Sequence, residues 1–398
     1  MKSLKIKDDF MWIGALDPNL RTFDIIMHTK YGTSYNSYLL KGSEKIVLFE
    51  TVKIKFWDEY IEKLSEYIDP KDIDYIVVNH TEPDHTGSIE KLLQLAPDVQ
   101  IVGSTAAIKF LKAIVNKPFN SIVVKDGDTL SLGNKTLKFI TAPFLHWPDS
   151  IYTYIEEDKT LLTCDSFGTH YCYEGILLSN LENKEDYVDS LKYYFDVIMG
   201  PYRKHVITAA KKIENIEIDI IATGHGPVID DNPREIIQRY IEWATETNPN
   251  TDTTVVIPYV SAYGYTEEMA RLIKEGIQSA GKFEVKLYDM VTSDNDEVMN
   301  EIYWADGVLF GSPTIVSDIL PPIMKLLTSM NPVVHSGKLV TAFGSYGWSG
   351  EAVPNIIGRL KQLRLKIFED GLKINFKPSD EEIKEIIEFG KRFGEKLL

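Results

Sequence analysis

His80-Thr81-Glu82-Pro83-Asp84-His85 decides the fold of the N-terminal part of the chain. This stretch follows an apolar, β-branched run at 75–79 and precedes a helix-like segment at 89–95. A strand, a polar turn and a helix in succession are where α/β proteins place functional residues. In extended backbone, alternate residues of the stretch would share one side, and Pro83 disfavours helix at the residue before it. Two imidazoles and two carboxylates in six residues suit zinc, iron or manganese, and a solvated polar turn rarely reaches this density.

Length and composition indicate a two-domain globular protein. The chain has 398 residues, 44% of them hydrophobic, which is more than one typical core needs. Its net charge is −16, from 43 basic and 59 acidic residues, and this argues against nucleic acid or an anionic membrane surface as a partner. Cys164 and Cys172 form no CxxC pair, so we expect a reducing cytoplasm and no cysteine-ligated centre. Signal-peptide-like and membrane-spanning runs are not expected either.

The chain is predicted to be α/β throughout, with a domain at 1–248 and a second at 249–398. In the first part, short strands alternate with helices, and polar residues follow the strand ends, which favours two sheets sandwiched between helices. A polar, proline-containing stretch at 246–253 reads as a linker. After it, five strands alternate with five helices, a pattern typical of a doubly wound parallel sheet of flavodoxin type.

Three further candidate ligands follow predicted strand ends in the first part: His146, Asp165 and His225. Strand ends at one edge of a sheet converge on one crevice, so we expect these residues to join the 80–85 stretch. Two metal ions, which lie about 3.5–4 Å apart in such sites, can share the set only if one carboxylate bridges them. Asp165 is the best bridge because it stands alone at its strand end. Taken singly, each residue also has an ordinary explanation, such as a helix N-cap for Asp165 or a turn for His225.

The order His80-x-Glu82-x-Asp84-His85, then His146, Asp165 and His225, resembles the ligand order of the metallo-β-lactamase superfamily. Hydrolases of that superfamily carry a histidine where this chain has Glu82. A carboxylate there is typical of the flavodiiron proteins, whose metallo-β-lactamase-like domain is followed by a flavodoxin-like domain, and this resemblance covers essentially the whole chain. A hard anionic ligand also favours iron redox chemistry over zinc hydrolysis. The resemblance implies one iron at His80, Glu82 and His146, a second at Asp84, His85 and His225, and a bridging Asp165, with His85 a ligand in only some members.

Two other positions bear on the resemblance. Asp24 stands where many family members carry a histidine over the active site. Tyr193 matches a tyrosine that the family places beside the irons, where it would donate a hydrogen bond or a proton to the bound intermediate. The alternative for Tyr193 is an aromatic side chain on the buried face of a helix. His28 and His170 are expected to be structural or surface residues.

Three loops after strands of the second part point to a flavin. Residues 261–266 form a hydroxyl-rich loop before a helix, which suits a phosphate, and they lack the lysine of a nucleoside-triphosphate loop. Residues 311–315 and 344–350 lie where an isoalloxazine ring would stack. The loops resemble those of flavodoxins and flavodiiron proteins, although the family often has asparagines at Val316-Ser317. The residues predicted to contact FMN are Ser261, Tyr263, Gly264, Tyr265, Thr266, Ser312, Pro313, Thr314, Ile315, Ser345, Tyr346, Gly347, Trp348 and Gly350.

The resemblance implies an oxidoreductase, an A-type flavoprotein that reduces dioxygen to water and/or nitric oxide to nitrous oxide. Its non-haem diiron site would receive electrons through FMN from an external donor. The sequence has no cysteine-rich rubredoxin-like extension, so we expect a separate rubredoxin or similar donor, with a reduced deazaflavin as the second choice. A head-to-tail homodimer, alone or as a dimer of dimers, is also implied. The alternatives are a zinc-dependent hydrolase of the metallo-β-lactamase superfamily and an electron-transfer flavoprotein with a structural metal site.

Overall fold

The computed structural model describes residues 3–25, 27–245 and 247–398, so the first residue of the predicted linker, 246, lies outside the described residues. By its internal contacts the chain divides into two compact units, 1–246 and 247–398, here called unit 1 and unit 2. Among the described helices, none combines the length and the apolar character needed to cross a bilayer.

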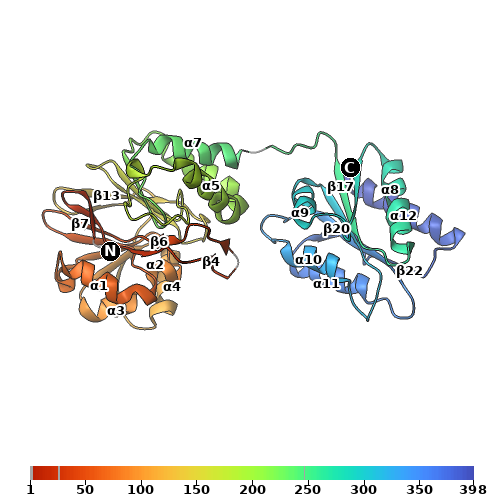
Figure 1. Cartoon of the computed structure of the whole chain (residues 1–398), viewed down its shortest axis with the longest axis horizontal. Helices are drawn as coiled ribbons and strands as arrows, with labels where there is room; N and C mark the ends of the chain where they lie inside the picture. The colour runs from red at the N-terminus through yellow and green to blue at the C-terminus, as the bar shows by residue number, and fades with distance from the viewer. Residues whose placement is uncertain (1–2, 26, 246) are drawn as a thin grey trace. The chain divides into compact units, whose positions relative to one another are not determined.

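Unit 1 is a sandwich of two sheets (Figure 1). The first sheet has the strand order β1-β2-β7-β8-β9-β10-β11, and the second has the order β12-β13-β14-β15-β16. Apolar residues from both sheets, such as Phe49 and Phe139, meet in one buried cluster between them. The strands of the first sheet are β1 Leu4–Lys7, β2 Phe10–Trp12, β7 Tyr38–Lys41, β8 Ile46–Phe49, β9 Tyr75–Val78, β10 Gln100–Gly103 and β11 Asn120–Val123; those of the second are β12 Thr129–Ser131, β13 Thr136–Thr141, β14 Ile151–Ile155, β15 Thr160–Cys164 and β16 Ile220–Thr223.

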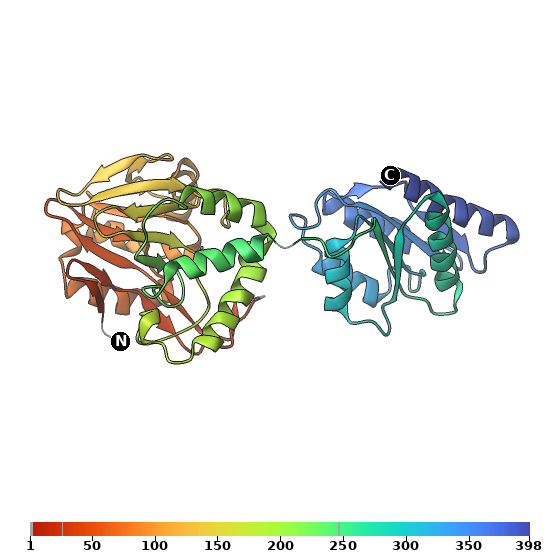
Figure 2. The same ribbon diagram turned by 90° about the horizontal axis from the view of Figure 1, so that it is seen from above.

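Helices cover the outer face of each sheet of unit 1. The helices α1 to α4 lie on one side and α5 and α7 on the other (Figure 1), and the view from above shows the yellow-green and green helices over the same part of the unit (Figure 2). Helix α7 turns an apolar stripe that includes Ile236, Ile237 and Tyr240 into this outer core, as its 3.6-residue periodicity requires. The bounds are α1 Trp57–Ser65, α2 Pro83–Thr86, α3 Ile89–Leu95, α4 Thr105–Val115, α5 Lys184–Tyr194, α6 Arg203–Lys212 and α7 Pro233–Ala244.

Unit 2 is a parallel sheet with helices on both faces. Its strands follow the order β18-β17-β19-β20, and β20 also pairs with both β21 and β22; all of these pairs are parallel. This is the doubly wound order of flavodoxin-type sheets. Helices α8 and α12 cover one face, and α9, α10 and α11 the other (Figure 1). The bounds are β17 Thr254–Tyr259, α8 Tyr265–Ala280, β18 Glu284–Asp289, α9 Asn295–Trp304, β19 Gly307–Gly311, α10 Pro321–Ser329, β20 Leu339–Tyr346, α11 Ala352–Gln362, β21 Lys366–Ile367, β22 Leu372–Asn375 and α12 Asp380–Leu397.

The fold corrects one local expectation. The turn after β9 is extended only as far as Glu82, whose backbone has φ −56° and ψ 142°. Pro83 then begins the short helix α2, since proline suits the first helical position, where an amide hydrogen has no partner. Asp84 and His85 therefore project from a helical turn, and the alternation expected across the whole stretch holds only for its first residues.

Candidate functional site

The seven predicted ligands lie together at one end of the sandwich of unit 1. His80 and Glu82 follow β9, and α2 adds Asp84 and His85. The other three come directly after or a few residues beyond strands of the second sheet, so both sheets contribute. Their ligand atoms fall into two groups, in each of which all atoms lie within 4.8 Å of one another. We call the seven residues the donor cluster: His80, Glu82, Asp84, His85, His146, Asp165 and His225.

The first group is His80, Glu82 and His146, with Asp165. The Oε2 of Glu82 lies 3.2 Å from the Nε2 of His80 and 3.1 Å from the Nε2 of His146. Both of these imidazole nitrogens also lie near the Oδ2 of Asp165, at 3.4 Å and 3.3 Å. Two nitrogens and two carboxylate oxygens therefore face one point, as the ligands of a single cation do.

The second group is Asp84, His85 and His225. The Oδ2 of Asp84 lies 3.1 Å from the Nε2 of His225 and 3.6 Å from the Nε2 of His85. The Oδ1 of Asp165 lies 3.1 Å from the Nε2 of His85 and 3.5 Å from the Nε2 of His225. Asp165 thus presents one oxygen to each group, which is the geometry that a bridging carboxylate requires.

The electrostatics of the donor cluster favour added positive charge. Burial opposes protonation of His146, but hydrogen bonds to Asp165 and Glu82 outweigh it and raise the pKa of His146 to about 9. Burial likewise opposes the charged form of His85, and the charges of Asp84 and Asp165 raise its pKa to about 9. Protons neutralise the buried carboxylates when no other cation does, and a bound metal ion would replace them. The donor set therefore fits two cations.

Asp24 lies beside the donor cluster. Burial, together with the negative charges of Glu82 and Asp84, raises the pKa of Asp24 to about 6. Its backbone is left-handed, with φ 46°. The position where the family often has a histidine is therefore held here by a carboxylate next to the first group.

Tyr193 and Tyr194 differ in their relation to the cluster. The hydroxyl of Tyr193 accepts a hydrogen bond from the backbone N–H of His28 at 3.3 Å, and its side chain is 43% exposed. Tyr194 is buried, and its ring centroid lies 5.0 Å from that of His170 and 6.4 Å from that of His225. The structure thus brings the neighbour of Tyr193, and not Tyr193, against a candidate ligand, and the role of Tyr193 stays a prediction.

Three loops of unit 2 meet at the carboxyl ends of β17, β19 and β20. The hydroxyl of Ser345 lies 2.9 Å from that of Thr266, and the carbonyl of Ser345 accepts the N–H of Thr314 at 2.9 Å. Gly264 precedes α8 with φ 86°, and a Cβ there would meet nothing within 4 Å. We call these loops, 261–266, 311–315 and 344–350, the loop edge. Open backbone at the start of a sixteen-residue helix fits a phosphate group.

Two aromatic side chains of the loop edge point into solvent. Tyr263 is 83% exposed and Trp348 is 87% exposed. Large apolar side chains left this open are suited to cover a planar ligand. Val316, next to the loop edge, is 88% exposed with a left-handed φ of 55°. Asparagine, which the family often has there, adopts this conformation more readily than a β-branched residue does.

Known proteins match both units of the chain. A family model described as ODP family beta lactamase matches residues 33–226, and a flavodoxin model matches residues 257–390. The chain is 42% identical to flavo-diiron protein FprA2 of Clostridium acetobutylicum, over 100% of each chain. The chain belongs to the flavodiiron protein family. Among its relatives is the nitric oxide reductase of Moorella thermoacetica, 36% identical over 98% of each chain.

Solved flavodiiron structures have the same two-part fold. Rubredoxin oxygen:oxidoreductase from Desulfovibrio gigas aligns with a TM-score of 0.69 and 30% identity, covering 100% of this chain and 98% of that chain. The flavodiiron protein from Giardia intestinalis aligns with a TM-score of 0.67 and 28% identity, covering 100% and 97%. The predicted metallo-β-lactamase-like and flavodoxin-like architecture is therefore confirmed.

The structure of this flavodiiron chain also reveals polar residues that the sequence pattern did not single out. The Oδ2 of Asp149 lies 3.1 Å from the Nδ1 of His80, and it accepts hydrogen bonds from the backbone and hydroxyl of Thr81 at 2.8 Å and 2.7 Å. The carbonyl of Ser34 lies 2.6 Å from the Nδ1 of His225. These contacts leave the Nε2 of each imidazole for the cluster and hold the ring in place. Asp149 follows His146 closely in sequence, but Ser34 acts through its backbone and offers no sequence signal.

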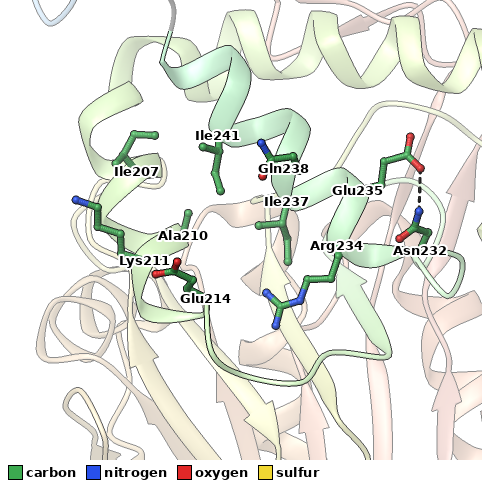
Figure 3. A pocket seen from close by; sticks show the side chains of 10 residues that line it. All are labelled: Ile207, Ala210, Lys211, Glu214, Asn232, Arg234, Glu235, Ile237, Gln238 and Ile241. Carbon is green, nitrogen blue, oxygen red and sulfur yellow. Dashed lines mark hydrogen bonds between the residues drawn. The ribbon is translucent and has the colours of Figure 1, made fainter.

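Two of the hollows in unit 1 differ in how near they lie to the donor cluster. The larger, of about 590 Å³, lies between α6 and α7 and is lined by Ile207, Ile237 and Ile241 under a charged rim (Figure 3). Its lining, within the described part of the chain, contains no member of the donor cluster. The smaller hollow, of about 240 Å³, is lined in part by His170, whose ring centroid is 5.0 Å from that of His225. Only the smaller hollow comes near the candidate ligands.

Proposed function

We propose that this flavodiiron protein reduces dioxygen to water and/or nitric oxide to nitrous oxide, with electrons delivered through FMN. Two non-haem irons in the donor cluster supply the redox-active centre at which the gas is reduced. The observation that carries the proposal is Glu82, whose carboxylate contacts both imidazoles of the first group. In the hydrolases of the superfamily a histidine takes this place, so the carboxylate favours a redox-active iron pair over a zinc pair.

The side chains of the cluster have separate tasks in this proposal. Glu82 and Asp84 each give one carboxylate oxygen to one group, and Asp165 gives one oxygen to each. Asp149 accepts the Nδ1 hydrogen of His80, which keeps the ring in the tautomer that ligates through Nε2. Burial of five of the seven cluster residues limits the access of bulk water to the reacting gas. Tyr193 remains the proposed hydrogen-bond or proton donor, and Tyr194 is placed closer to His225.

The loop edge would hold FMN. Ser261 and Thr266 lie at the start of α8, where backbone N–H groups and the helix dipole attract the phosphate. Tyr263 and Trp348 would cover the isoalloxazine ring, since both are exposed next to the loops. Two relatives are named flavo-diiron protein and type A flavoprotein, and the flavodoxin model matches residues 257–390 of this unit.

An external protein donor would reduce the flavin. The solved relative from Desulfovibrio gigas is named for rubredoxin, which makes a rubredoxin the first donor to test and a reduced deazaflavin the second. A head-to-tail homodimer, alone or as a pair of dimers, would bring one subunit's flavin to the irons of the partner. Cysteine usage favours the reducing cytoplasm as the location. Protein that is monomeric at micromolar concentration and fully active would contradict the dimer.

Metal analysis and gas turnover test the proposal together. We expect two irons and one FMN per chain, and rapid turnover when anaerobically reduced protein meets dioxygen or nitric oxide. Two zincs together with esterase or nuclease activity would instead support the hydrolase. A reduced protein that reoxidises without catalytic turnover would support the electron carrier. Steady-state rates with each gas and reduced rubredoxin then rank the two substrates.

A further inference from the structure

A buried carboxylate, Glu50, lies directly after β8, close enough to His85 for the two charges to interact. Glu50 is 2% exposed, and its backbone has a left-handed φ of 55°. Its Oε1 accepts the backbone N–H of Asn79 at 2.8 Å. Such a conformation and burial cost free energy for a carboxylate, so the surrounding structure has to hold it there.

His85 is held next to Glu50 by the neighbouring residue. The backbone N–H and the hydroxyl of Thr51 both donate to the carbonyl of His85, each at 2.7 Å. A Cβ at Gly224 would lie 2.7 Å from the Cε1 of His85, so the ring also packs tightly against that glycine. The carbonyl and the ring face are thereby fixed, and the remaining freedom is a flip of the ring that exchanges its nitrogens with its carbons.

Three buried polar atoms in this place have complementary chemistry. The Oε2 of Glu50, the Nδ2 of Asn79 and the Nδ1 of His85 are buried without a hydrogen-bond partner among residues 3–25, 27–245 and 247–398. The Oδ1 of Asn79 accepts from the hydroxyl of Thr153 at 2.6 Å, which fixes which end of the amide is the donor. The set therefore consists of one acceptor and two donors, which one bridging water can satisfy together.

The charges of these groups also act on one another. Burial raises the pKa of Glu50 to about 7, whereas the charge of His85 and the hydrogen bond from the backbone N–H of Asn79 lower it. The Nε2 of His85 faces Asp165 at 3.1 Å. With Nε2 directed to the cluster, Nδ1 carries the hydrogen of the neutral ring and needs an acceptor.

We propose that Glu50 is the positioning residue that commits His85 to ligate the second metal ion through Nε2. Glu50 accepts the Nδ1 hydrogen of His85 through one bridging water, whereas Asp149 contacts the Nδ1 of His80 directly at 3.1 Å. The proposal rests on the proposed function only in taking the donor cluster as a two-metal site. The family resemblance leaves the role of His85 variable. In this chain the proposal makes His85 a ligand, because the carboxylate of Glu50 satisfies its Nδ1.

Glu50→Gln tests the proposal. The amide has one oxygen acceptor where the carboxylate has two, so it can serve either Asn79 or His85 but not both. We expect the second metal ion to bind about 10–100-fold more weakly while the first is retained. Metal affinities are measured by chelator competition on the full chain, with iron(II) and zinc(II) separately. Glu44→Gln, which changes an exposed glutamate two residues before the same strand, is the matched control.

A double-mutant cycle with His85→Ala separates positioning from a general structural role. If Glu50 acts through His85, Glu50→Gln weakens metal binding no further in the His85→Ala background. Additive losses, or an unchanged affinity in Glu50→Gln alone, would overturn the proposal. If Glu50→Gln folds poorly, Glu50→Asp serves as a second variant, because it keeps both acceptor oxygens. Glu50→Asp should recover part of the affinity for the second metal ion. Equal losses of that affinity in both variants would contradict a positioning role. Binding of zinc in place of iron would contradict the proposed function but leave this comparison intact.

Discussion

The donor cluster and the loop edge select their ligands with different parts of the chain. In the cluster, every contact to a cation would come from a side chain. Further side chains orient the imidazoles, as Asp149 does by contacting the Nδ1 of His80. At the loop edge, the groups available to bind a ligand are a helix N-terminus, open glycine backbone and two exposed aromatic rings. One substituted atom can therefore abolish a metal site, whereas a flavin site built largely on backbone loses affinity in small steps.

Asp165→Asn should have the largest effect. The amide offers a single oxygen, so it cannot present one oxygen to each group as the carboxylate does. We expect iron to fall below one per chain and gas reduction to become undetectable, while FMN content stays unchanged. The exposed Asp98→Asn is the control. Two irons retained in Asp165→Asn would show that Asp165 does not bridge.

Glu82→His should come next. A neutral imidazole in place of the carboxylate removes one negative charge from the first group and favours zinc over iron. The zinc-to-iron ratio after growth in both metals should rise, and turnover with dioxygen and nitric oxide should fall about tenfold or more. Elemental analysis and steady-state rates measure the two outcomes. Reductase activity at the original level would refute this account of Glu82.

The metal-free protein should lose stability as the pH rises. His85 and His146 have folded-state pKa values of about 9, above the ordinary 6.5, because buried carboxylates favour their charged forms. The contribution of each is thus fully present below about pH 6.5 and is lost as the pH rises through about 9, on the order of 3 kcal/mol for each imidazole. Chemical denaturation of chelator-treated protein at about pH 6 and pH 9.5 measures this. Protein loaded with metal should lack the decline, since the cation replaces the protons.

Trp348→Ala tests the loop edge. The side chain is 87% exposed, so its loss should change the unfolding free energy by about 0.5 kcal/mol or less. Loss of stacking should raise the dissociation constant of FMN about tenfold, and iron content should not change. Fluorescence titration of the flavin-free protein gives the affinity. Val291→Ala, at another exposed apolar position of unit 2, serves as the control, and an equal loss in both variants would exclude stacking on Trp348.

Val316→Asn should have the smallest effect, and its sign is favourable. A β-branched residue with φ 55° is strained, and asparagine relieves part of that strain. We expect unit 2 to gain about 0.5–1 kcal/mol and FMN affinity to stay the same or rise slightly. Thermal denaturation followed by flavin fluorescence reports both. Val333→Asn, at an exposed valine without a left-handed backbone, should bring no gain.

Sequence patterns predicted the long elements and missed the short ones. The apolar run at 75–79 forms β9 over Tyr75–Val78, and the helix-like segment at 89–95 is α3 with the predicted bounds, because periodicity and flanking residues agree with the environment. The two-stranded pairs β3 (Ala15–Asp17) with β6 (Thr33–Tyr35), and β4 (Thr22–Phe23) with β5 (Met27–His28), were not predicted. Strands of two or three residues carry too little pattern, and only their partners in space define them.

The sequence by itself determined which side chains are candidate metal donors and the order of the two units. Histidine and carboxylate side chains at strand ends are specific in type, so His80, Asp165 and His225 could be named before their distances were known. The tertiary structure decided how Asp165 divides its oxygens between two groups. It also decided which residues contact the Nδ1 nitrogens of the imidazoles and orient the rings. Glu50, Asp149 and the carbonyl of Ser34 come from separate strands and loops, and only folding brings them to the rings. Residues that orient a ligand are defined by their proximity in the folded chain, and the spacing of residues along the sequence does not predict that proximity.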